Sequence, residues 1–259
     1  MLYDANASVG SWPFRPLPTR TAGQLLARLD EIGVDRALVA SLNAVCYRDV
    51  YAGTEELLAE IAPYRDRLTP VAVLNPLYAG WQRDLDAACA AGCVGLRLYP
   101  NYHRYELTGA DGRKLLAAAV ERDLLLCFVC RHEDRRQRHW MDTPEDLSLA
   151  EIAAGLDPFP QARFLILEPI GLESSPFAVD PRWRERRFGL DISRLTSVLT
   201  NSIPNLIDRI GAEKLVFGTG LPLKGPNSAL LKLNLIEDSA ARSRIGGANL
   251  QALLGETPA

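Results

Sequence analysis

The sequence predicts an α/β fold, a single (β/α)8 TIM barrel that spans residues 1–259. Short apolar segments of strand length alternate strictly with helical segments, eight such strands can be counted, and 259 residues suit one closed eight-stranded barrel. Strands covered on both faces are nearly continuous apolar runs, as most of these are. An open doubly wound sheet is the alternative arrangement of the same units. No linker or low-complexity segment divides the chain, so we expect one domain.

The elements follow one another as β-loop-α units. Apolar side chains at Leu25, Leu26, Leu29 and Ile32 recur at helical spacing, and Gly33 ends that first helix. Residues 6–18, rich in Gly, Pro, Ser and aromatics, are expected to form a structured loop over a site. Strands are predicted at 2–4, 37–40, 70–74, 94–98, 124–129, 163–167, 188–192 and 215–218. Helices are predicted at 21–32, 54–62, 81–91, 112–122, 147–155 and 195–210, with a last helical stretch from 228 onward.

Composition narrows the classes of partner. A hydrophobic content of 47% supports a large core, and a formal net charge of −3 gives no basic field for nucleic acid or for an anionic membrane. No apolar run reaches the roughly 18 residues that a membrane-spanning helix needs. Five cysteines, an odd number, without a secretory signal favour a cytoplasmic protein. We therefore expect a small-molecule ligand, no nucleic acid, no membrane and no cofactor, while a homo-oligomer stays open.

Barrel chemistry is built at the carboxyl ends of the strands, and nearly every predicted strand ends in a polar group. Barrel rims are polar in any case, so some of these side chains will only cap helices or meet water. The candidates for substrate binding are Asn6, Ser8, Asn43, Asn75, Arg97, Tyr99, Arg131 and Thr219, and those for catalysis are Glu168, His132 and Asp191.

Glu168 and Arg97 are the most informative candidates. Glu168 directly follows four apolar residues, where a carboxylate would lose its hydration unless it served a site or had an arginine partner. Arg97 alternates with apolar residues and should project into the barrel, where a guanidinium needs an anion: Glu168, Asp191 or a substrate carboxylate. His132 is one of three histidines and the one nearest a strand end, although the charged run 131–139 around it is also typical of a solvated loop.

Five short motifs together resemble the amidohydrolase-related family, the branch that includes pyrone-dicarboxylate lactonase and the aminocarboxymuconate and resorcylate decarboxylases. The motifs are YDANASVG at 3–10, GLRLYP at 95–100, LDIS at 190–193, FGTGLP at 217–222 and IGGANL at 245–250. Each is weak alone, but their order along nearly the full length makes the set moderately specific. The resemblance implies a TIM-barrel hydrolase or decarboxylase that acts on a small carboxylated substrate.

The chain departs from that family at the positions of the metal ligands. In the family the first strand ends in His-x-His, later strands add histidines, and the last strand adds an aspartate. Here these positions hold Asn6 and Ser8, then Glu168, then Gly220, while His132 competes with Cys130 for the strand-five position. An amide, a hydroxyl and one carboxylate are poor ligands for zinc, so we predict no tightly bound transition metal.

Three functions remain open from the sequence. The first is a metal-independent hydrolase that uses Glu168, His132 and Asp191, for which the discriminating feature would be Glu168 and His132 facing one cavity. The second is a catalytically inactive family member that binds a small ligand or a partner subunit. The third is a metal-dependent hydrolase or decarboxylase with an unusual ligand set.

Overall fold

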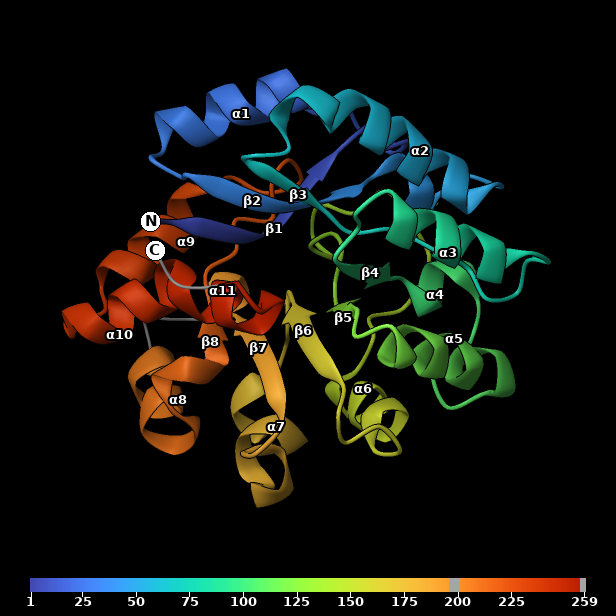
Figure 1. Ribbon diagram of the computed structural model, residues 1–259. Coiled ribbons are helices and arrows are strands. Elements are labelled where there is room, and N and C mark those ends of the chain that lie inside the picture. Colours follow the sequence, from blue (N-terminus) through green and yellow to red (C-terminus); the bar gives the residue numbers. More distant parts are fainter. Residues whose placement is uncertain (196–200, 257–259) are drawn as a thin grey trace.

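The computed structural model describes residues 1–195 and 201–256, and in this part eight parallel strands form a ring with helices outside it (Figure 1). The strands are β1 (Tyr3–Val9), β2 (Arg36–Ser41), β3 (Leu68–Pro70), β4 (Gly95–Leu98), β5 (Leu125–Val129), β6 (Arg163–Leu167), β7 (Arg187–Asp191) and β8 (Leu215–Val216). The helices are α1 (Ala22–Glu31), α2 (Val50–Ile61), α3 (Trp81–Ala90), α4 (Pro100–His103), α5 (Ala110–Glu121), α6 (Leu149–Leu156), α7 (Pro176–Val179), α8 (Ser202–Ile210), α9 (Asn227–Asn234), α10 (Ser239–Ser243) and α11 (Asn249–Leu254), and a π-helical turn, Arg244–Ala248, joins the last two.

Two seams join a three-stranded sheet, β1–β3, to a five-stranded sheet, β4–β8. At the β8–β1 seam the Ala5 amide donates to the Phe217 carbonyl and the Gly220 amide donates to the Asn6 carbonyl, both at 2.9 Å. At the β3–β4 seam Ala72 lies beside Leu96, and the Arg97 amide donates to the Ala72 carbonyl at 2.8 Å. These bonds close the ring, so the predicted (β/α)8 barrel is confirmed and the open doubly wound sheet is excluded.

Several element boundaries differ from those predicted. The first strand continues to Val9, so Asn6 and Ser8 belong to β1 and not to an irregular loop; a bulge between Asp4 and Ala7 adjusts its pairing with β2. Helix α2 begins at Val50, earlier than predicted, because the Asp49 side chain accepts from the Ala52 amide and caps it. β3 ends at Pro70, although 71–74 stay buried in the barrel wall.

The predicted helix 195–210 is also corrected at its start. Leu195 has an extended backbone and ends a short 3-10 turn after β7. The described helix is α8, from Ser202, and residues 196–200 lie outside the described part of the chain.

The apolar side chains form two cores. One fills the barrel, where Leu38, Val71, Leu125 and Leu165 point inward. The other lies between strands and helices and includes a group of four aromatic rings, Phe164, Phe177, Trp183 and Phe188. Phe164 stacks on Phe188 with 5.2 Å between ring centroids, and Phe177 meets Trp183 edge-on at 4.6 Å. These rings anchor β6 and β7, whose carboxyl ends carry the site described below.

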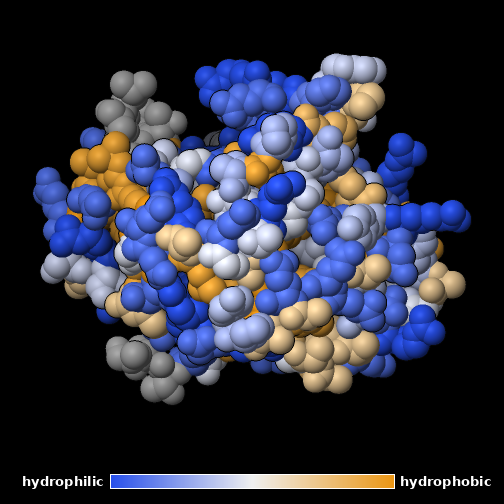
Figure 2. All heavy atoms as spheres, turned by 90° about the horizontal axis from the view of Figure 1, so that it is seen from above, coloured by the Kyte–Doolittle hydropathy of each residue, from blue (hydrophilic) through white to orange (hydrophobic). Residues whose placement is uncertain are grey.

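The surface shown in Figure 2, turned by 90° from the view of Figure 1, is mainly hydrophilic, with hydrophobic side chains in small groups. The described helices include none that is both long and apolar enough to cross a membrane.

Candidate functional site

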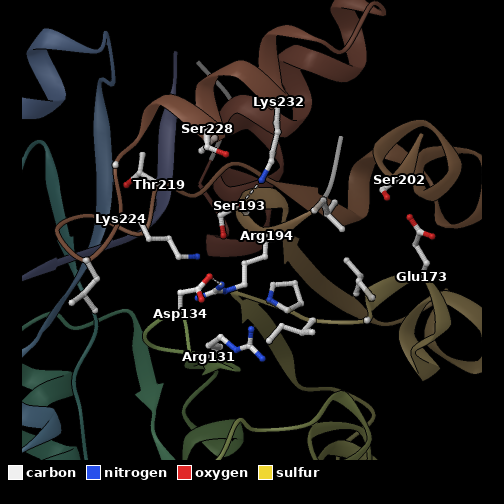
Figure 3. A pocket seen from close by; sticks show the side chains of 18 of the residues that line it. Arg131, Asp134, Glu173, Ser193, Arg194, Ser202, Thr219, Lys224, Ser228 and Lys232 are labelled. Carbon is white, nitrogen blue, oxygen red and sulfur yellow. Dashed lines mark hydrogen bonds and ion pairs between the residues drawn. The ribbon is translucent and has the colours of Figure 1, made fainter. Parts of the chain in front are cut away.

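A cavity of about 1140 Å3 opens where the chain leaves β5, β6, β7 and β8 (Figure 3). Its wall is formed by the loops that follow these strands and by α8 and α9. Among the described residues it has six basic side chains, Arg131, Arg136, Arg194, Arg209, Lys224 and Lys232, and two acidic ones, Asp134 and Glu173. The size suits a small organic molecule, and the excess of basic groups favours an anionic one.

Four of these cations come close together: Arg131, Arg194, Lys224 and Lys232, which we call the cation cluster. In Figure 3, Lys224 and Arg194 lie side by side with Asp134, Lys232 extends toward them from α9, and Arg131 lies beyond Arg194. Lys232 donates to the Ser193 carbonyl, and no carboxylate of the described residues lies within ion-pair distance of it. Nη2 of Arg194 is buried and has no hydrogen-bond partner in the described part of the chain. The cluster therefore retains donor capacity for an anionic ligand.

Glu168 is the counterion of two cluster members. Its side chain is 4% exposed, its Oε2 lies 2.7 Å from Arg194 Nε and also contacts Lys224 Nζ, and Asn6 donates to its Oε1 at 2.9 Å. The backbone of Glu168 adopts φ 56°, in the left-handed region that costs a non-glycine residue on the order of 1–3 kcal/mol. The carboxylate is thus held between β1 and the loops after β7 and β8 at the expense of local strain.

Asp191 and Asp4 form the layer beneath Glu168. Asp191 accepts from the Ser193 hydroxyl at 2.7 Å and from the Glu168 amide at 3.2 Å. Asp4 accepts from the Thr219 amide at 2.8 Å and from the Asn6 amide at 2.9 Å. Burial raises the pKa of both carboxyls above their usual values, and the hydrogen bonds from Ser193 and Thr219 oppose that rise. These two acids lock the strand ends that carry Asn6, Glu168 and Thr219.

Arg97 projects into the barrel and is 1% exposed, as its alternation with apolar residues predicts. Its guanidinium donates to the Ala7 carbonyl at 2.9 Å and to the Ser8 hydroxyl at 3.1 Å, and no described carboxylate lies within ion-pair distance. The expectation of a carboxylate partner in Glu168 or Asp191 is therefore wrong, because bulged strand β1 turns a carbonyl and a hydroxyl toward Arg97 instead.

His132 and Tyr99 lie in a separate aromatic group. The His132 ring meets Trp12 edge-on, with 4.6 Å between ring centroids, and meets Tyr99 at 5.4 Å. His132 and Tyr99 border a void of about 10 Å3 and not the large cavity. Burial, with smaller contributions from Arg97 and other cations, lowers the pKa of His132 to about 3, so the imidazole is neutral at pH 7. The structure does not bring His132 and Glu168 to one cavity.

Of the other predicted site residues, two line the cavity and two stabilise loops away from it. Thr219 and Arg131 line the cavity, the latter paired with Asp146 at 2.6 Å. Asn43 accepts from the Ser11 amide and donates to Glu56, and Asn75 closes a turn by accepting from the Leu77 amide. Both asparagines thus hold loops in place.

Sequence reasoning missed Arg194, Lys224 and Lys232. Arg194 follows the LDIS motif at the end of β7, and Lys224 follows FGTGLP after β8, so both occupied the strand-end positions that the barrel rule identifies. Lys232 lies on α9, far from any strand end, so nothing in the sequence identified it as a site residue.

The electrostatics of Lys224 are unusual for an amine. Burial, together with the nearby charge of Lys232, lowers the pKa of Lys224 to about 7, while Asp134 acts in the opposite direction. At neutral pH this lysine exchanges readily between ammonium and amine, which is the property of a group that transfers protons.

Comparisons with known proteins show what the fold resembles. No family model and no curated protein matches the sequence. Among solved structures, 5-carboxyvanillate decarboxylase from Sphingomonas paucimobilis is 13% identical with a TM-score of 0.73, covering 99% of each chain. A probable 2-pyrone-4,6-dicarboxylic acid hydrolase from Acinetobacter baumannii, with citric acid bound, is 16% identical with a TM-score of 0.68 over 98% of this chain and 99% of that one. A dihydroxybenzoic acid decarboxylase from Polaromonas sp. JS666, with bound manganese and the inhibitor 2-nitroresorcinol, is 14% identical with a TM-score of 0.72 over 98% and 96%.

The manganese in the Polaromonas structure raises the question of whether a metal would fit here. In the described residues no group of three His, Cys, Asp or Glu side chains could hold one. Asn6 and Ser8 are weak neutral donors, and Glu168 and Asp191 already accept from Arg194, Lys224, Asn6 and Ser193. This donor set does not suit a transition metal. The chain therefore shares with these solved decarboxylases and the probable hydrolase the fold of a TIM barrel.

Proposed function

We propose that this protein is a hydrolase that binds a small carboxylated substrate in the cavity and acts on it without a metal centre. The observation that carries the proposal is the cation cluster, which keeps donors on Arg194 and Lys232 although Glu168, Asp134 and Asp146 lie within ion-pair distance of other cluster atoms. Guanidinium and ammonium groups are the usual partners of carboxylates. The names of the structural neighbours, with their carboxylated substrates, and the citric acid bound to one of them agree with such a ligand.

The reaction follows from the chemistry of Lys224 and Glu168. A substrate carboxylate bound by Arg194 and Lys232 would place an ester or lactone carbonyl against Lys224. The ammonium then stabilises the negative charge that develops on the carbonyl oxygen. Glu168, in contact with Lys224, accepts a proton from the attacking water and returns it to the leaving oxygen as the carbon–oxygen bond of the ester or lactone breaks. Asp191 holds the Glu168 backbone in position. Proton transfer thus falls to Glu168 and charge stabilisation to Lys224, and His132 remains part of the aromatic wall.

Replacing Lys232 with methionine should weaken carboxylate binding about tenfold, because the ligand loses a charged donor that has no carboxylate partner of its own. Isothermal titration calorimetry with citrate measures this. Lys114→Met, at a side chain that is 66% exposed on α5, is the matched control and should bind citrate as the wild type does. Absence of carboxylate binding at millimolar concentration would refute the proposal, as would hydrolysis of carboxylated lactones that Lys224→Met leaves intact.

Anion binding should also weaken as the pH rises through about 7, because Lys224 then loses its proton and the cluster loses one positive charge. The charged groups around Lys224 are Glu168, Arg194, Lys232, Asp134 and Arg131. Benzene-1,3-disulfonate keeps a constant charge over this range, so its affinity reports on the protein alone. We expect a decline of about tenfold between pH 6 and pH 9 in the wild type and a clearly smaller decline in Lys224→Met, where Asp191, whose pKa burial raises to about 7, can still titrate. A flat wild-type profile would show that Lys224 does not titrate there.

A further inference from the structure

Asn6, Glu168 and Gly220 are far apart in the sequence but lie side by side in the structure. Asn6 donates to Glu168 Oε1 at 2.9 Å, and the Gly220 amide donates to the Asn6 carbonyl at 2.9 Å. A Cβ atom added to Gly220 would lie 2.7 Å from Glu168 Oε1 and 3.0 Å from Lys224 Cδ. Asn6, Glu168 and Gly220 are also three of the positions at which the chain departs from the metal-ligand pattern of the family it resembles, so the structure gathers these three at one point, whereas Ser8 accepts from Arg97.

Lys224 occupies that point because residue 220 has no side chain. Gly220 has φ +74°, a conformation that favours glycine, and its carbonyl accepts from the Lys224 amide at 3.0 Å in a tight turn. The turn folds the Lys224 side chain back across Gly220 until Nζ contacts Glu168 Oε2. Any side chain at 220 would compete with both Glu168 and Lys224 for this space. The glycine and the lysine therefore work as a pair.

We infer that the Lys224 ammonium, seated across Gly220 on Glu168, whose other oxygen Asn6 holds, is a built-in cation that replaces a metal ion at this end of the barrel. When protonated, it supplies a covalently attached positive charge beside the cavity, and Arg194 shares its counterion. A covalently attached ammonium group fits a donor set in which an amide and one carboxylate replace imidazoles. The role of this charge in polarising a substrate rests on the proposed function, whereas the cation site itself can be tested without a substrate.

The test removes the built-in cation and offers external ones. Thermal unfolding of Lys224→Ala is followed with no addition, with millimolar MnCl2 and with methylammonium chloride. We expect the variant to melt several degrees below the wild type and each cation to restore part of the loss, since Glu168 then has a vacant partner position. The wild-type Tm should not respond to MnCl2 or to EDTA. Lys224→Ala/Glu168→Gln should show no rescue, and Lys114→Met should behave as the wild type.

Two results would overturn the inference: near-stoichiometric binding of Mn2+ by the wild type in calorimetry, or a Lys224→Ala variant with wild-type Tm and no cation response. If Lys224→Ala does not fold, as judged by circular dichroism, Lys224→Gln is examined in the same way, and the wild-type calorimetry decides independently. Failure of the hydrolase proposal would appear as absent turnover or absent carboxylate binding, and these measurements leave the Tm series unaffected.

Discussion

Glu168→Gln should lower the free energy of unfolding by about 3–5 kcal/mol, the largest effect expected of any substitution at the site. The carboxylate is the shared counterion of Arg194 and Lys224, and its side chain is 4% exposed. Its loss would leave a guanidinium and an ammonium group close together in a poorly hydrated position. Urea denaturation at pH 6, where Lys224 is mostly protonated, measures the change.

Two further variants test whether the loss of stability is specific to the charge of Glu168. Glu173→Gln alters an exposed acid on the same cavity wall and should change stability by less than about 0.5 kcal/mol. Adding Lys224→Met to Glu168→Gln should recover part of the loss, because one of the uncompensated charges is then gone. A loss below about 1 kcal/mol in the single variant would mean that Glu168 is not the principal counterion.

Phe164→Ala should cost about 3–5 kcal/mol through the cavity that it leaves among the aromatic rings. The ring is fully buried on β6 and packs against Phe188, Phe177 and Trp183 with centroid distances of 5.2, 5.7 and 5.9 Å. Because β6 ends directly before Glu168, we also expect weaker citrate binding in this variant.

The control for Phe164→Ala is Trp140→Ala, which removes a larger ring that is 81% exposed and should be nearly neutral for stability. Similar losses for the two variants would contradict the assignment of the aromatic group as core.

The fold could be predicted from the sequence because barrel strands are buried on both faces and are therefore apolar throughout, and because the helices between them have regular apolar spacing. The exact ends of the strands and helices were harder to predict from the sequence. The end of β1 is hard to recognise because Asn6 and Ser8 are polar, and their burial depends on β8 and Arg97, which lie more than 80 residues away. The start of α2 depended on the Asp49 cap.

Only part of the candidate site could be predicted from the sequence, again because contacts between distant residues decide the rest. The burial of Glu168 follows from the apolar run before it, and its need for a cationic partner follows from desolvation. Which cation serves depends on how the loops after β7 and β8 fold back, and that geometry rests on Gly220 and on hydrogen bonds to Asp4 and Asp191. His132 was nominated for its chemistry, whereas its position is set by packing against Trp12 and Tyr99.

The seam between β8 and β1 is one of the two lines along which the sheets of the barrel are joined. Glu168, Lys224 and the cavity belong to the larger sheet and its loops, whereas Asn6 belongs to the smaller one, and a few backbone bonds at Ala5, Ser8 and Gly220 hold the two edges together there. Side-chain bonds join the same two sheets, from Asn6 to Glu168 and from Thr219 to Asp4. The groups beneath the cavity therefore also act as rivets of the closed ring, and their loss would weaken its closure as well as the order at its mouth.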